Sequence, residues 1–565
     1  MTKLDDLKAE NEAPEWMDEA GFRVISNGYM LEGETPRAMY TRVAKAAASH
    51  TKDPSKSEAQ FFSAMWKNWL CPASPVLSNM GTSRGLPISC NSIHVHDSVQ
   101  GIFDKSTELA MLTKNGAGVG IYLGDVRGRG AAIKGNGKSE GIIPWAKLYD
   151  TTISSVSQGS TRRGAGAVYL PIEHLDVEEF LHIRRPTGDI NRRCLNLNHG
   201  VTLTDEWMQD MVAGDKAKRV MWAEILKTRV ETGEPYLFFS DSVNRHNPEC
   251  YKANGLNVST SNICTEITLY TDPDHSFVCC LSSLNLARWE EWKESDLPEV
   301  ATRFLDAVLE EYICKSEGVP GLESARRSAI KGRAIGIGAL GWHSLLQSKM
   351  LPFDGMQAML LNAMVFKYIR QGADKATREL AKELGEPEWC KGHGIRNTHL
   401  LAVAPTVSNS TISGGHSAGI EPFSANIWTQ KGAQGTFIRK NTFLKGLLQA
   451  KGKDTKAVWK TILEDLGSVQ NLIFLSEEEK AVFLTARELN QHAIVRQAAQ
   501  RQTYVDQAQS VNLFFATNSD PKYIHEVHLE AWKSGLKTLY YLRTEGVLRG
   551  DLASRSSEEC LACEG

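Results

Sequence analysis

The sequence predicts an α/β fold with a largely parallel sheet. Between about residues 71 and 290, short apolar runs alternate with helical segments and glycine-rich connections, as at 118–123, 167–170 and 195–198. Such alternation is typical of parallel strands joined by helical crossovers. Hydrophobic residues make up 42% of the 565 positions and charged residues 23%, which is the composition of an ordinary globular protein with a large core.

The segments on either side of this region are mostly helical. Residues 1–70 have amphipathic spacing, and Ser57 is the expected cap of a helix that runs toward Leu70. Residues 299–400 are also helical, except for the glycine-rich run 336–341. That run suits a tightly packed turn or strand, because glycine permits close backbone approach.

Toward the C-terminus the pattern returns to strands. A passage rich in glycine, serine and threonine at 405–419 precedes helices at about 440–505. Two late strands, 511–515 and 538–542, are separated by another helix. The polar residues beyond 546 predict a disordered tail.

Charge and targeting signals narrow the function classes. The net charge of −3 argues against nucleic acid as the main partner, because phosphate-binding surfaces usually make a domain basic. The N-terminus lacks the apolar core of a signal peptide, and no run approaches the ~18 apolar residues of a membrane helix. We therefore expect a cytoplasmic protein without a membrane partner. Its eleven cysteines should be thiols unless catalysis oxidises them.

The polar tail carries a Cys-x-x-Cys motif, Cys560 and Cys563. On a mobile arm, such a pair can exchange disulfides with a partner sulfur and with an external reductant. Half of a zinc site is the alternative, but zinc needs four ligands, and the last thirty residues contain no histidine or further cysteine. The motif therefore indicates a cysteine-based reaction that consumes two electrons per turnover.

Asn262, Cys264 and Glu266 stand at alternate positions. In an extended segment, a period of two would send all three side chains to one face. They would combine a hydrogen-bonding amide, a sulfur nucleophile or radical, and an acid/base carboxylate. A half-buried strand with a small core cysteine explains the pattern equally well, so both interpretations stay open here.

Three further cysteines invite the same two interpretations. Cys279 and Cys280 are adjacent and would point to opposite faces of a strand, so at most one of them can share a site with Cys264. Cys90 lies far upstream in the chain. Core sulfur is again the alternative for all three.

Six short motifs follow one another along the chain. They are Pro-Ile-Ser-Cys at 87–90, Ser-Asn-Ile-Cys-Thr-Glu-Ile at 261–267, Cys-Cys-Leu-Ser-Ser-Leu-Asn-Leu at 279–286, Pro-Thr-Val-Ser-Asn-Ser at 405–410, Gly-Ile-Glu-Pro at 419–422 and Leu-Tyr-Tyr at 539–541. In this order they closely resemble the large subunits of ribonucleotide reductases. The resemblance implies a short helical layer over 1–70, a ten-stranded α/β barrel with a central finger loop over 71–545, and a flexible redox tail over 546–565.

The resemblance also implies a reaction. Cys264, at the tip of the finger loop, would carry a thiyl radical that abstracts the ribose 3′-hydrogen. Glu266 would take the proton of the 3′-hydroxyl, and Asn262 would hold the ribose hydroxyls. The 2′-hydroxyl would leave as water while Cys90 and Cys279 become a disulfide.

The same resemblance assigns three further cysteines and the electron donor. Cys280 would be an additional structural thiol. Cys560 and Cys563 would reduce the disulfide with electrons from thioredoxin or glutaredoxin.

Substrate and effector contacts are likewise implied by the resemblance. The substrate diphosphate would lie on backbone groups at a helix N-terminus, although a surface loop is the alternative for that segment. A deoxynucleotide or ATP would act as allosteric effector, and a loop would relay its identity to the substrate. The residues implied are, for substrate, Ser74, Ser89, Thr406, Val407, Ser408 and Asn409; for effector, Asp97, Ser98, Arg127 and Lys134; for the specificity loop, Gln158, Arg162 and Arg163.

Tyr540 and Tyr541 resemble the tyrosine pair of class I enzymes, in which a separate small (beta) subunit supplies the radical. Tyr541 would receive the oxidising equivalent and Tyr540 would pass it to Cys264. The radical-generating metal cofactor is then expected in the partner and no metal in this chain. A homodimer is also expected. Only 89 residues precede Cys90, so an N-terminal ATP-binding domain, and inhibition by dATP through it, are expected to be absent.

Two alternatives remain at this point. An adenosylcobalamin-dependent reductase would use the same barrel, but Tyr540 and Tyr541 argue against it. A non-catalytic nucleotide-binding regulator, or a zinc/thiol protein, could have kept the fold. The intact set of Asn262, Cys264 and Glu266 argues against that second alternative.

Overall fold

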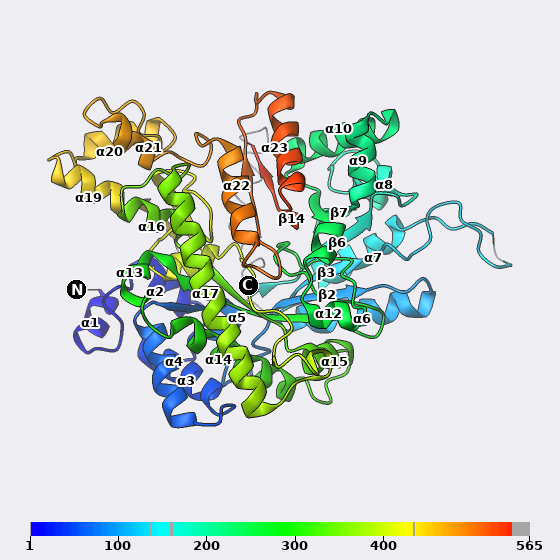
Figure 1. Ribbon diagram of the computed structural model, residues 1–565, viewed down its shortest axis with the longest axis horizontal. Coiled ribbons are helices and arrows are strands. Elements are labelled where there is room, and N and C mark those ends of the chain that lie inside the picture. Colours follow the sequence, from blue (N-terminus) through cyan, green and yellow to red (C-terminus); the bar gives the residue numbers. More distant parts are fainter. Residues whose placement is uncertain (1, 136, 159–161, 433–434, 545–565) are drawn as a thin grey trace.

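Nine strands form one curled sheet in the part of the chain that the structure describes (Figure 1). The structure is a computed structural model that describes all residues except 1, 136, 159–161, 433–434 and 545–565. In sheet order the strands are β1 (Leu70–Pro72), β9 (Phe277–Asn285), β2 (Cys90–His94), β3 (Gly118–Tyr122), β6 (Ala165–Pro171), β7 (Leu197–Leu203), β8 (Tyr236–Phe239) and β14 (Thr538–Leu539), with β10 (Ile335–Leu340) also paired to β9. The predicted α/β class is confirmed.

The sheet contains two sets of parallel strands. Strands β2, β3, β6, β7 and β8 are mutually parallel, as the alternating sequence predicts. Strand β9 is antiparallel to β2 and parallel to β10. Three backbone N–H···O=C bonds carry the pairing beyond β10: Ile337 to Leu400 at 2.8 Å, Val403 to Ala508 at 3.1 Å and Tyr540 to Val511 at 2.9 Å. Because Tyr540 follows β14, which pairs with β8, these bonds lead back toward the other end of the sheet.

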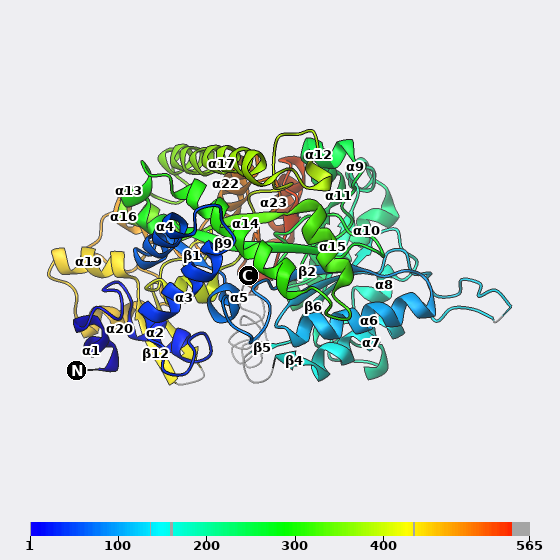
Figure 2. The ribbon, with the colours of Figure 1, turned by 90° about the horizontal axis from the view of Figure 1, so that it is seen from below.

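Helices surround this sheet, and Figure 2 shows the N-terminal ones on one side and α6 and α7 on the other. The N-terminal layer comprises α1 (Lys3–Ala9), α2 (Glu19–Ser26), α3 (Pro36–Ala48), α4 (Pro54–Trp66) and, after β1, α5 (Ser74–Asn79). The helices among the parallel strands are α6 (Val99–Lys114), α7 (Ile143–Ser155), α8 (Val177–Phe180), α9 (Asp205–Ala213), α10 (Lys216–Thr232), α11 (Ser240–Arg245) and α12 (Glu249–Ala253).

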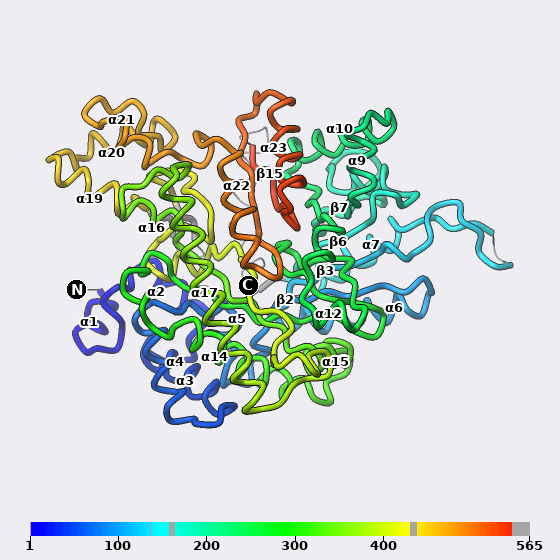
Figure 3. Tube along the Cα trace, viewed as in Figure 1, coloured from blue at the N-terminus to red at the C-terminus, as the bar shows by residue number. Residues whose placement is uncertain are grey.

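The second half of the chain is richer in helices. They are α13 (Trp289–Trp292), α14 (Leu297–Lys315), α15 (Glu323–Gly332), α16 (Trp342–Ser348), α17 (Met356–Leu384), α18 (Val407–Ile412), α19 (Thr442–Ala450), α20 (Lys456–Glu464), α21 (Glu477–Val482), α22 (Gln491–Gln502) and α23 (Pro521–Lys533). Figure 3 traces the late chain through α22 and α23, which contact each other. No helix among the described residues is long and apolar enough to cross a membrane.

Several short elements complete the fold. Three two-stranded pairs join β4 (Ser157–Gln158) to β5 (Arg162–Arg163), β11 (Ile427–Gly432) to β12 (Gly435–Lys440) and β13 (Leu513–Phe514) to β15 (Leu542–Arg543). Single 3₁₀ turns occur at Ile190–Arg192, Leu286–Arg288 and Glu388–Cys390. The glycine-rich run at 336–341 is mostly strand β10, which is one of the two structures its sequence suits.

The predicted cap of α4 is wrong. The helix begins three residues before Ser57, with Pro54 at its first position and Asp53 as the N-cap. A carboxylate oxygen of Asp53 accepts a hydrogen bond from the backbone N–H of Lys56 at 3.2 Å. Aspartate caps as well as serine does, and proline is favoured at the first helical position, so the earlier start is the more stable one.

A loop at residues 258–268, which we call the finger loop, crosses the interior of the curled sheet. It passes so close to β3 that a Cβ atom on Gly120 would lie 1.9 Å from the backbone oxygen of Ser261. No side chain fits there without moving the backbone of one of the two segments. Gly120 therefore sets how near the finger loop lies to the sheet.

We expect Gly120→Ala to lower the free energy of unfolding by at least about 2 kcal/mol, because overpacked cores strain the backbone. Gly446→Ala is the matched control, since a Cβ there meets nothing within 4 Å in helix α19. The control should be neutral or stabilised by about 0.5–1 kcal/mol. Denaturant unfolding measures both, and equal midpoints for the two variants would contradict this packing of the finger loop.

Candidate active site

The finger loop brings Asn262, Cys264 and Glu266 into the interior of the curled sheet. All three are buried, at 0%, 1% and 0% relative exposure. The segment is not extended, because residues 263–265 form a turn and Thr265 has a φ of +69°. A period of two therefore does not explain the site. The turn and its contacts explain instead how the three residues come to share one buried loop.

Two side chains that are distant in the sequence hold the backbone of this turn. The hydroxyl of Tyr169, on β6, donates to the backbone oxygen of Asn262 at 2.6 Å. The hydroxyl of Ser510 donates to the backbone oxygen of Cys264 at 2.5 Å and also contacts Glu266 Oε2 at 3.1 Å. Within the loop, Asn262 Oδ1 accepts the backbone N–H of Ile267 at 3.2 Å. The thiol thus sits on a fixed backbone.

The carboxyl of Glu266 is suited to proton transfer near neutral pH. Burial raises the pKa of Glu266 to about 7, against the opposing effect of the nearby Asn262 amide and Ser510 hydroxyl. A general base works best when its pKa lies near the working pH. Glu266 Oε1 and Asn262 Nδ2 are buried and make no hydrogen bond to any described residue, so both can receive a polar ligand.

We expect catalysis to depend on ionisation of Glu266. The rate in wild type should rise with pH through an apparent pKa of about 7, since the carboxyl must lose its proton before it can act as a base. Glu266→Gln should lower kcat/KM by about 10²- to 10⁴-fold and remove this limb of the pH profile. An unchanged profile in the variant would assign the ionisation to another group.

The same residue should make folding stability depend on pH in the opposite direction. Between its usual value near 4.5 and its value of about 7 in the fold, Glu266 is ionised in the unfolded chain and protonated in the native one. Its contribution to stability therefore falls as pH rises through this window, by roughly 3 kcal/mol at most. Glu266→Gln should be more stable than wild type at pH 8 and equal to it at pH 4, measured by denaturant unfolding.

Tyr540 and Tyr541 lie between β14 and β15, directly beside the thiol. The Tyr540 hydroxyl donates to Cys264 Sγ at 3.7 Å. The rings of Tyr540 and Tyr541 have centroids 4.3 Å apart, with planes tilted by 50°. The chain therefore does not send the two side chains to opposite faces. Their rings and the sulfur form a continuous series of contacts.

Sequence reasoning missed two residues that support this series. The ring of Tyr236, on β8, packs against Tyr540 and Tyr541 with centroid distances of 4.8 and 5.1 Å. The amide of Asn198 contacts the hydroxyls of Tyr236 and Tyr541 at 2.5 and 3.0 Å. No motif marks these positions, because they meet the late tyrosines only through the pairing of β8 with β14.

Cys90 and Cys279 face each other across β2 and β9. They are direct partners in the antiparallel register, whereas Cys280 pairs with Ile335 of β10 on the other edge of β9. Cβ atoms of opposite residues in such a pair lie about 4.5–5.5 Å apart, near the spacing of a disulfide. Both residues are thiols here. Burial raises the pKa of Cys279 well above its usual value.

The six residues predicted to bind substrate lie near two short helices and before β2. Ser74 begins α5, and its Oγ accepts the hydroxyl of Tyr29 at 2.8 Å. Ser89 is buried immediately before β2. Thr406 precedes α18 with a φ of +54°, and its Oγ1 accepts the backbone N–H of Gly419 at 2.7 Å.

Helix α18 carries the rest of that segment. Val407 is exposed, while Ser408 and Asn409 are buried. Asn409 Nδ2 donates to the backbone oxygen of Pro72 at 3.1 Å, which connects α18 to β1. The segment is therefore a helix start attached to the sheet and not a free surface loop.

Some of the predicted effector residues are brought together at the start of α6. Arg127 Nε donates to Asp97 Oδ2 at 2.8 Å. Ser98 caps α6 by accepting the backbone N–H of Gly101 at 3.0 Å. Lys134 is exposed, in the segment between β3 and α7. Figure 1 shows a long loop projecting from the molecule near α7.

The structure describes only some of the remaining predicted residues. In the specificity loop, the backbones of Gln158 and Arg162 are opposite each other in the β4–β5 pair, and Arg163 is opposite Ser157. Cys560 and Cys563 lie outside the described residues.

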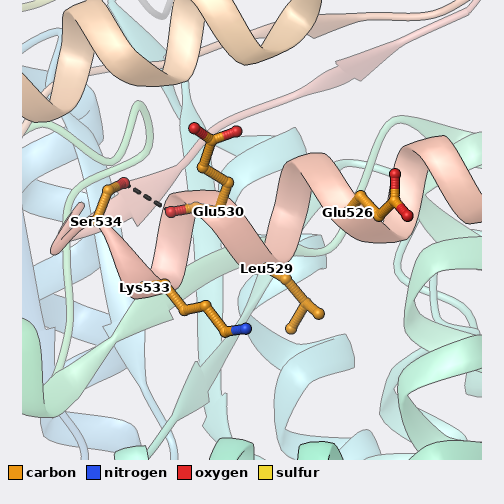
Figure 4. A pocket seen from close by; sticks show the side chains of 5 residues that line it. All are labelled: Glu526, Leu529, Glu530, Lys533 and Ser534. Atoms are coloured by element: carbon orange, nitrogen blue, oxygen red, sulfur yellow. Dashed lines mark hydrogen bonds between the residues drawn. The ribbon is translucent and has the colours of Figure 1, made fainter.

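A surface groove of about 400 Å³ lies along α23, apart from the buried thiol (Figure 4). It is lined by Glu526, Leu529, Glu530, Lys533 and Ser534. The Ser534 hydroxyl donates to the backbone oxygen of Glu530 at 2.6 Å. The groove contains none of the residues that sequence reasoning singled out.

The chemistry of the buried site indicates redox catalysis on sulfur. A nucleophilic cysteine is usually activated by an adjacent base that takes its proton, whereas Cys264 accepts a hydrogen bond from a tyrosine. Two further thiols, those of Cys90 and Cys279, are paired across neighbouring strands of the same sheet. Fold and site together define the class of the protein as an α/β oxidoreductase.

Comparisons with known proteins identify the family of oxidoreductases to which the chain belongs. The family model described as "Ribonucleotide reductase, all-alpha domain" matches residues 15–85, and "Ribonucleotide reductase, barrel domain" matches 88–220, 215–392 and 387–542. The chain belongs to the large subunits of class I ribonucleotide reductase, the ribonucleoside-diphosphate reductases. Such a large subunit relies on a small subunit for its radical cofactor.

Individual relatives agree along nearly the whole chain. The putative ribonucleoside-diphosphate reductase large subunit of Frog virus 3 (isolate Goorha) is 41% identical over 521 residues, spanning 88% of this chain and 91% of the relative. The ribonucleoside-diphosphate reductase large subunit of Invertebrate iridescent virus 3 is 35% identical over 630 residues, spanning 97% and 98%. Among solved structures, the Actinobacillus ureae class Id ribonucleotide reductase alpha subunit matches with a TM-score of 0.88 and 41% identity, covering 94% of this chain and 98% of that one.

Proposed function

We propose that this chain reduces ribonucleoside diphosphates at C2′ through a thiyl radical on Cys264. The observation that carries the proposal is the placement of Cys264 Sγ 3.7 Å from the Tyr540 hydroxyl, on the same buried loop as the Glu266 carboxyl. One group can deliver an oxidising equivalent to the sulfur, and the other can receive a proton from the substrate. The curled sheet, whose backbone hydrogen bonds continue through residues 400–403 and 508–511, supports the inference of a ten-stranded barrel around this finger loop.

The radical enters through the tyrosines. Tyr541 is oxidised by the small subunit, Tyr540 passes the equivalent on, and Cys264 loses the hydrogen of its thiol. Ring centroids 4.3 Å apart and a hydroxyl in contact with the sulfur support short transfers.

The substrate ribose then reacts at two neighbouring carbons. Cys264 takes the 3′-hydrogen, Glu266 takes the proton of the 3′-hydroxyl, and Asn262 Nδ2 donates to a ribose hydroxyl. The C2′–O bond breaks and water leaves. Cys90 and Cys279 supply two electrons and two protons and form an S–S bond, and Cys264 returns the hydrogen to C3′. Overall, one C2′–OH and two thiols become one C2′–H, one water and one disulfide.

Binding residues follow the family pattern. Thr406, Val407, Ser408 and Asn409 hold the diphosphate, with Ser74 and Ser89 beside the ribose. Effector deoxynucleotides or ATP bind near Asp97, Ser98, Arg127 and Lys134 in a homodimer. Gln158, Arg162 and Arg163 relay the choice of base. The Asp97–Arg127 ion pair supports this placement, because it holds the arginine at the start of α6.

The C-terminal thiols restore the site. Cys560 and Cys563 reduce the Cys90–Cys279 disulfide and are themselves reduced by thioredoxin or glutaredoxin. This keeps the exchange with external protein away from the buried radical site.

The proposal is tested by measuring deoxyribonucleoside diphosphate formation. The assay contains a ribonucleoside diphosphate, an effector nucleotide, thioredoxin and a class I small subunit. Product that depends on the small subunit is expected. Product formed with adenosylcobalamin alone and no small subunit would replace the tyrosine route by a cobalamin one.

A further inference from the structure

Two cysteines outside the candidate active site lie on segments that are packed together. Cys250 is on α12, shortly before the finger loop, and Cys390 ends the 3₁₀ turn at Glu388–Cys390. Helix α12 contacts this turn. One nitrogen, Asn254 Nδ2, donates to the backbone oxygen of Cys250 at 2.7 Å and to that of Trp389 at 3.1 Å. The backbones that carry the two cysteines are therefore held side by side.

The two thiols hydrogen-bond in a definite order. The thiol of Cys390 donates to Cys250 Sγ. The thiol of Cys250 points in turn toward the backbone oxygen of Thr398, at 4.0 Å. The hydrogen bond between the thiols lowers the pKa of Cys250, against the opposing effect of burial, and raises the pKa of Cys390. Because the thiolate is the reactive form of cysteine, Cys250 is the nucleophile of the pair.

The pair does not have the surroundings of a metal site. A structural zinc ion needs four ligands. Within the part of the chain that the structure describes, no group of three or more histidine, cysteine, aspartate or glutamate side chains could hold a metal ion. Both cysteines are thiols. Two thiols in contact can give up two electrons together and become a disulfide.

We propose that Cys250 and Cys390 are a second redox pair, which hydrogen peroxide oxidises to a disulfide that cross-links the segment before the finger loop to the segment before residue 400. The cysteines are only 1% and 0% exposed, but the neighbouring residues Glu249 and Lys391 are exposed. Local opening of a single surface turn therefore admits a molecule as small as peroxide. The cross-link is a reversible staple at the base of the finger loop, and it does not depend on the proposed function.

The oxidation balances in two steps. The Cys250 thiolate attacks one oxygen of hydrogen peroxide, the O–O bond breaks, hydroxide leaves and Cys250 becomes a sulfenic acid. Cys390 then attacks the sulfur of Cys250, an S–S bond forms and a second hydroxide leaves. The two thiol protons convert both hydroxides to water. Overall, two thiols and one hydrogen peroxide become one disulfide and two waters, and a reducing dithiol restores the thiols.

The test maps the cysteines of the full chain after oxidation. The reduced protein, without substrate or small subunit, is treated with hydrogen peroxide, blocked with N-ethylmaleimide and digested without reduction. Peptide mass spectrometry should find a peptide that joins Cys250 to Cys390, and dithiothreitol should remove it. This part of the test needs no substitution, so it does not depend on whether a variant folds.

Two variants test the order of the steps. In Cys390→Ser, the serine hydroxyl can still donate to Cys250, and oxidation should stop at a Cys250 sulfenic acid that dimedone traps. In Cys250→Ser, Cys390 should stay a thiol, because its buried sulfur resists ionisation. Dimedone found on Cys390 in Cys250→Ser, and none on Cys250 in Cys390→Ser, would contradict the order of attack.

Cys71 is the matched control in the same sample. It is 7% exposed, more than either member of the pair. Its sulfur contacts Ser413 Oγ at 3.1 Å and Asn68 Oδ1 at 3.5 Å, and burial raises the pKa of Cys71 to about 12. If exposure alone governed oxidation, Cys71 would react before the pair. We expect Cys71 to stay a thiol while Cys250 and Cys390 become linked.

The cross-link should also stabilise the oxidised chain, because it closes a long loop and constrains the unfolded state. Peroxide-treated wild type should unfold at a higher denaturant concentration than peroxide-treated Cys250→Ser, and dithiothreitol should shrink this difference. Absence of the linked peptide in wild type, a disulfide from Cys250 to another cysteine, or oxidation of Cys71 at the same rate would overturn the inference. None of these results bears on deoxynucleotide formation, which is measured separately.

Discussion

Cys264→Ser should lose turnover by at least about a thousandfold, the size of effect seen when a group central to the chemistry is removed. Serine keeps the size and the backbone contacts of Cys264, including the hydrogen bond from Ser510. Its O–H bond is much stronger than the S–H bond of cysteine, so a tyrosyl radical cannot take that hydrogen. The loss therefore appears in kcat, measured as deoxyribonucleoside diphosphate formed per minute with saturating small subunit.

The matched control for this change is Cys194→Ser. Cys194 is fully buried, and the charged groups around it are Asp150, Lys147, Arg184 and Arg193, none of which is a candidate site residue. The free energy of unfolding of this variant should fall by about 1–3 kcal/mol, because a hydroxyl is buried in place of a thiol. Its kcat should stay near that of wild type. Residual turnover of Cys264→Ser above a few per cent would mean that another residue carries the radical.

Tyr540→Phe should abolish radical delivery, and turnover should fall on the order of a hundredfold or more. Phenylalanine keeps the ring that packs against Tyr236 and Tyr541. It removes only the hydroxyl that contacts Cys264 Sγ at 3.7 Å. The fold and the binding of the small subunit should be retained, which melting curves and pull-down with that subunit measure.

Tyr236→Phe provides the comparison. Its ring is as buried as that of Tyr540 and packs against both members of the pair, but its hydroxyl contacts Asn198. We expect this variant to retain most of its activity. If Tyr236→Phe and Tyr540→Phe lose activity equally, the sulfur contact of Tyr540 does not explain its role.

The sequence predicts the parallel strands and the motifs, but it does not predict the tertiary contacts that bring the motifs together. Parallel strands β3, β6 and β7 follow from local alternation of apolar and helical segments. The turn at Thr265 does not, because its positive φ is imposed by tertiary contacts from Tyr169 and Ser510, which no local pattern indicates. The three candidate side chains therefore meet on a turn that the alternating pattern does not predict.

Residues that act through other residues were the ones missed. Ser510 and Asn198 carry ordinary hydroxyl or amide groups, and they meet the site only after the late chain folds against the first half of the sheet. The sequence carries one signal for such residues, the polar side chains at 507, 509, 510 and 512 next to the apolar residues 513–515. Buried polar groups of that kind need partners, so such a run marks a polar interior.

The choice between Cys279 and Cys280 as the partner of Cys90 shows what strand register adds to the sequence motif. The motif alone favours Cys279, and the structure adds that Cys90 is its direct cross-strand partner. Cys280 is instead the register partner of Ile335 in β10. Register is a property of the assembled sheet, so local sequence could not supply it.

The most direct test of the central claim is a single turnover without external reductant. A chain with Cys560→Ser and Cys563→Ser is mixed with small subunit, effector and ribonucleoside diphosphate, and the deoxy product and the disulfides are counted in the same sample. The account predicts one deoxyribonucleoside diphosphate for each new Cys90–Cys279 disulfide, and neither in Cys264→Ser. Product without that disulfide, or a disulfide that instead includes Cys280, would contradict it.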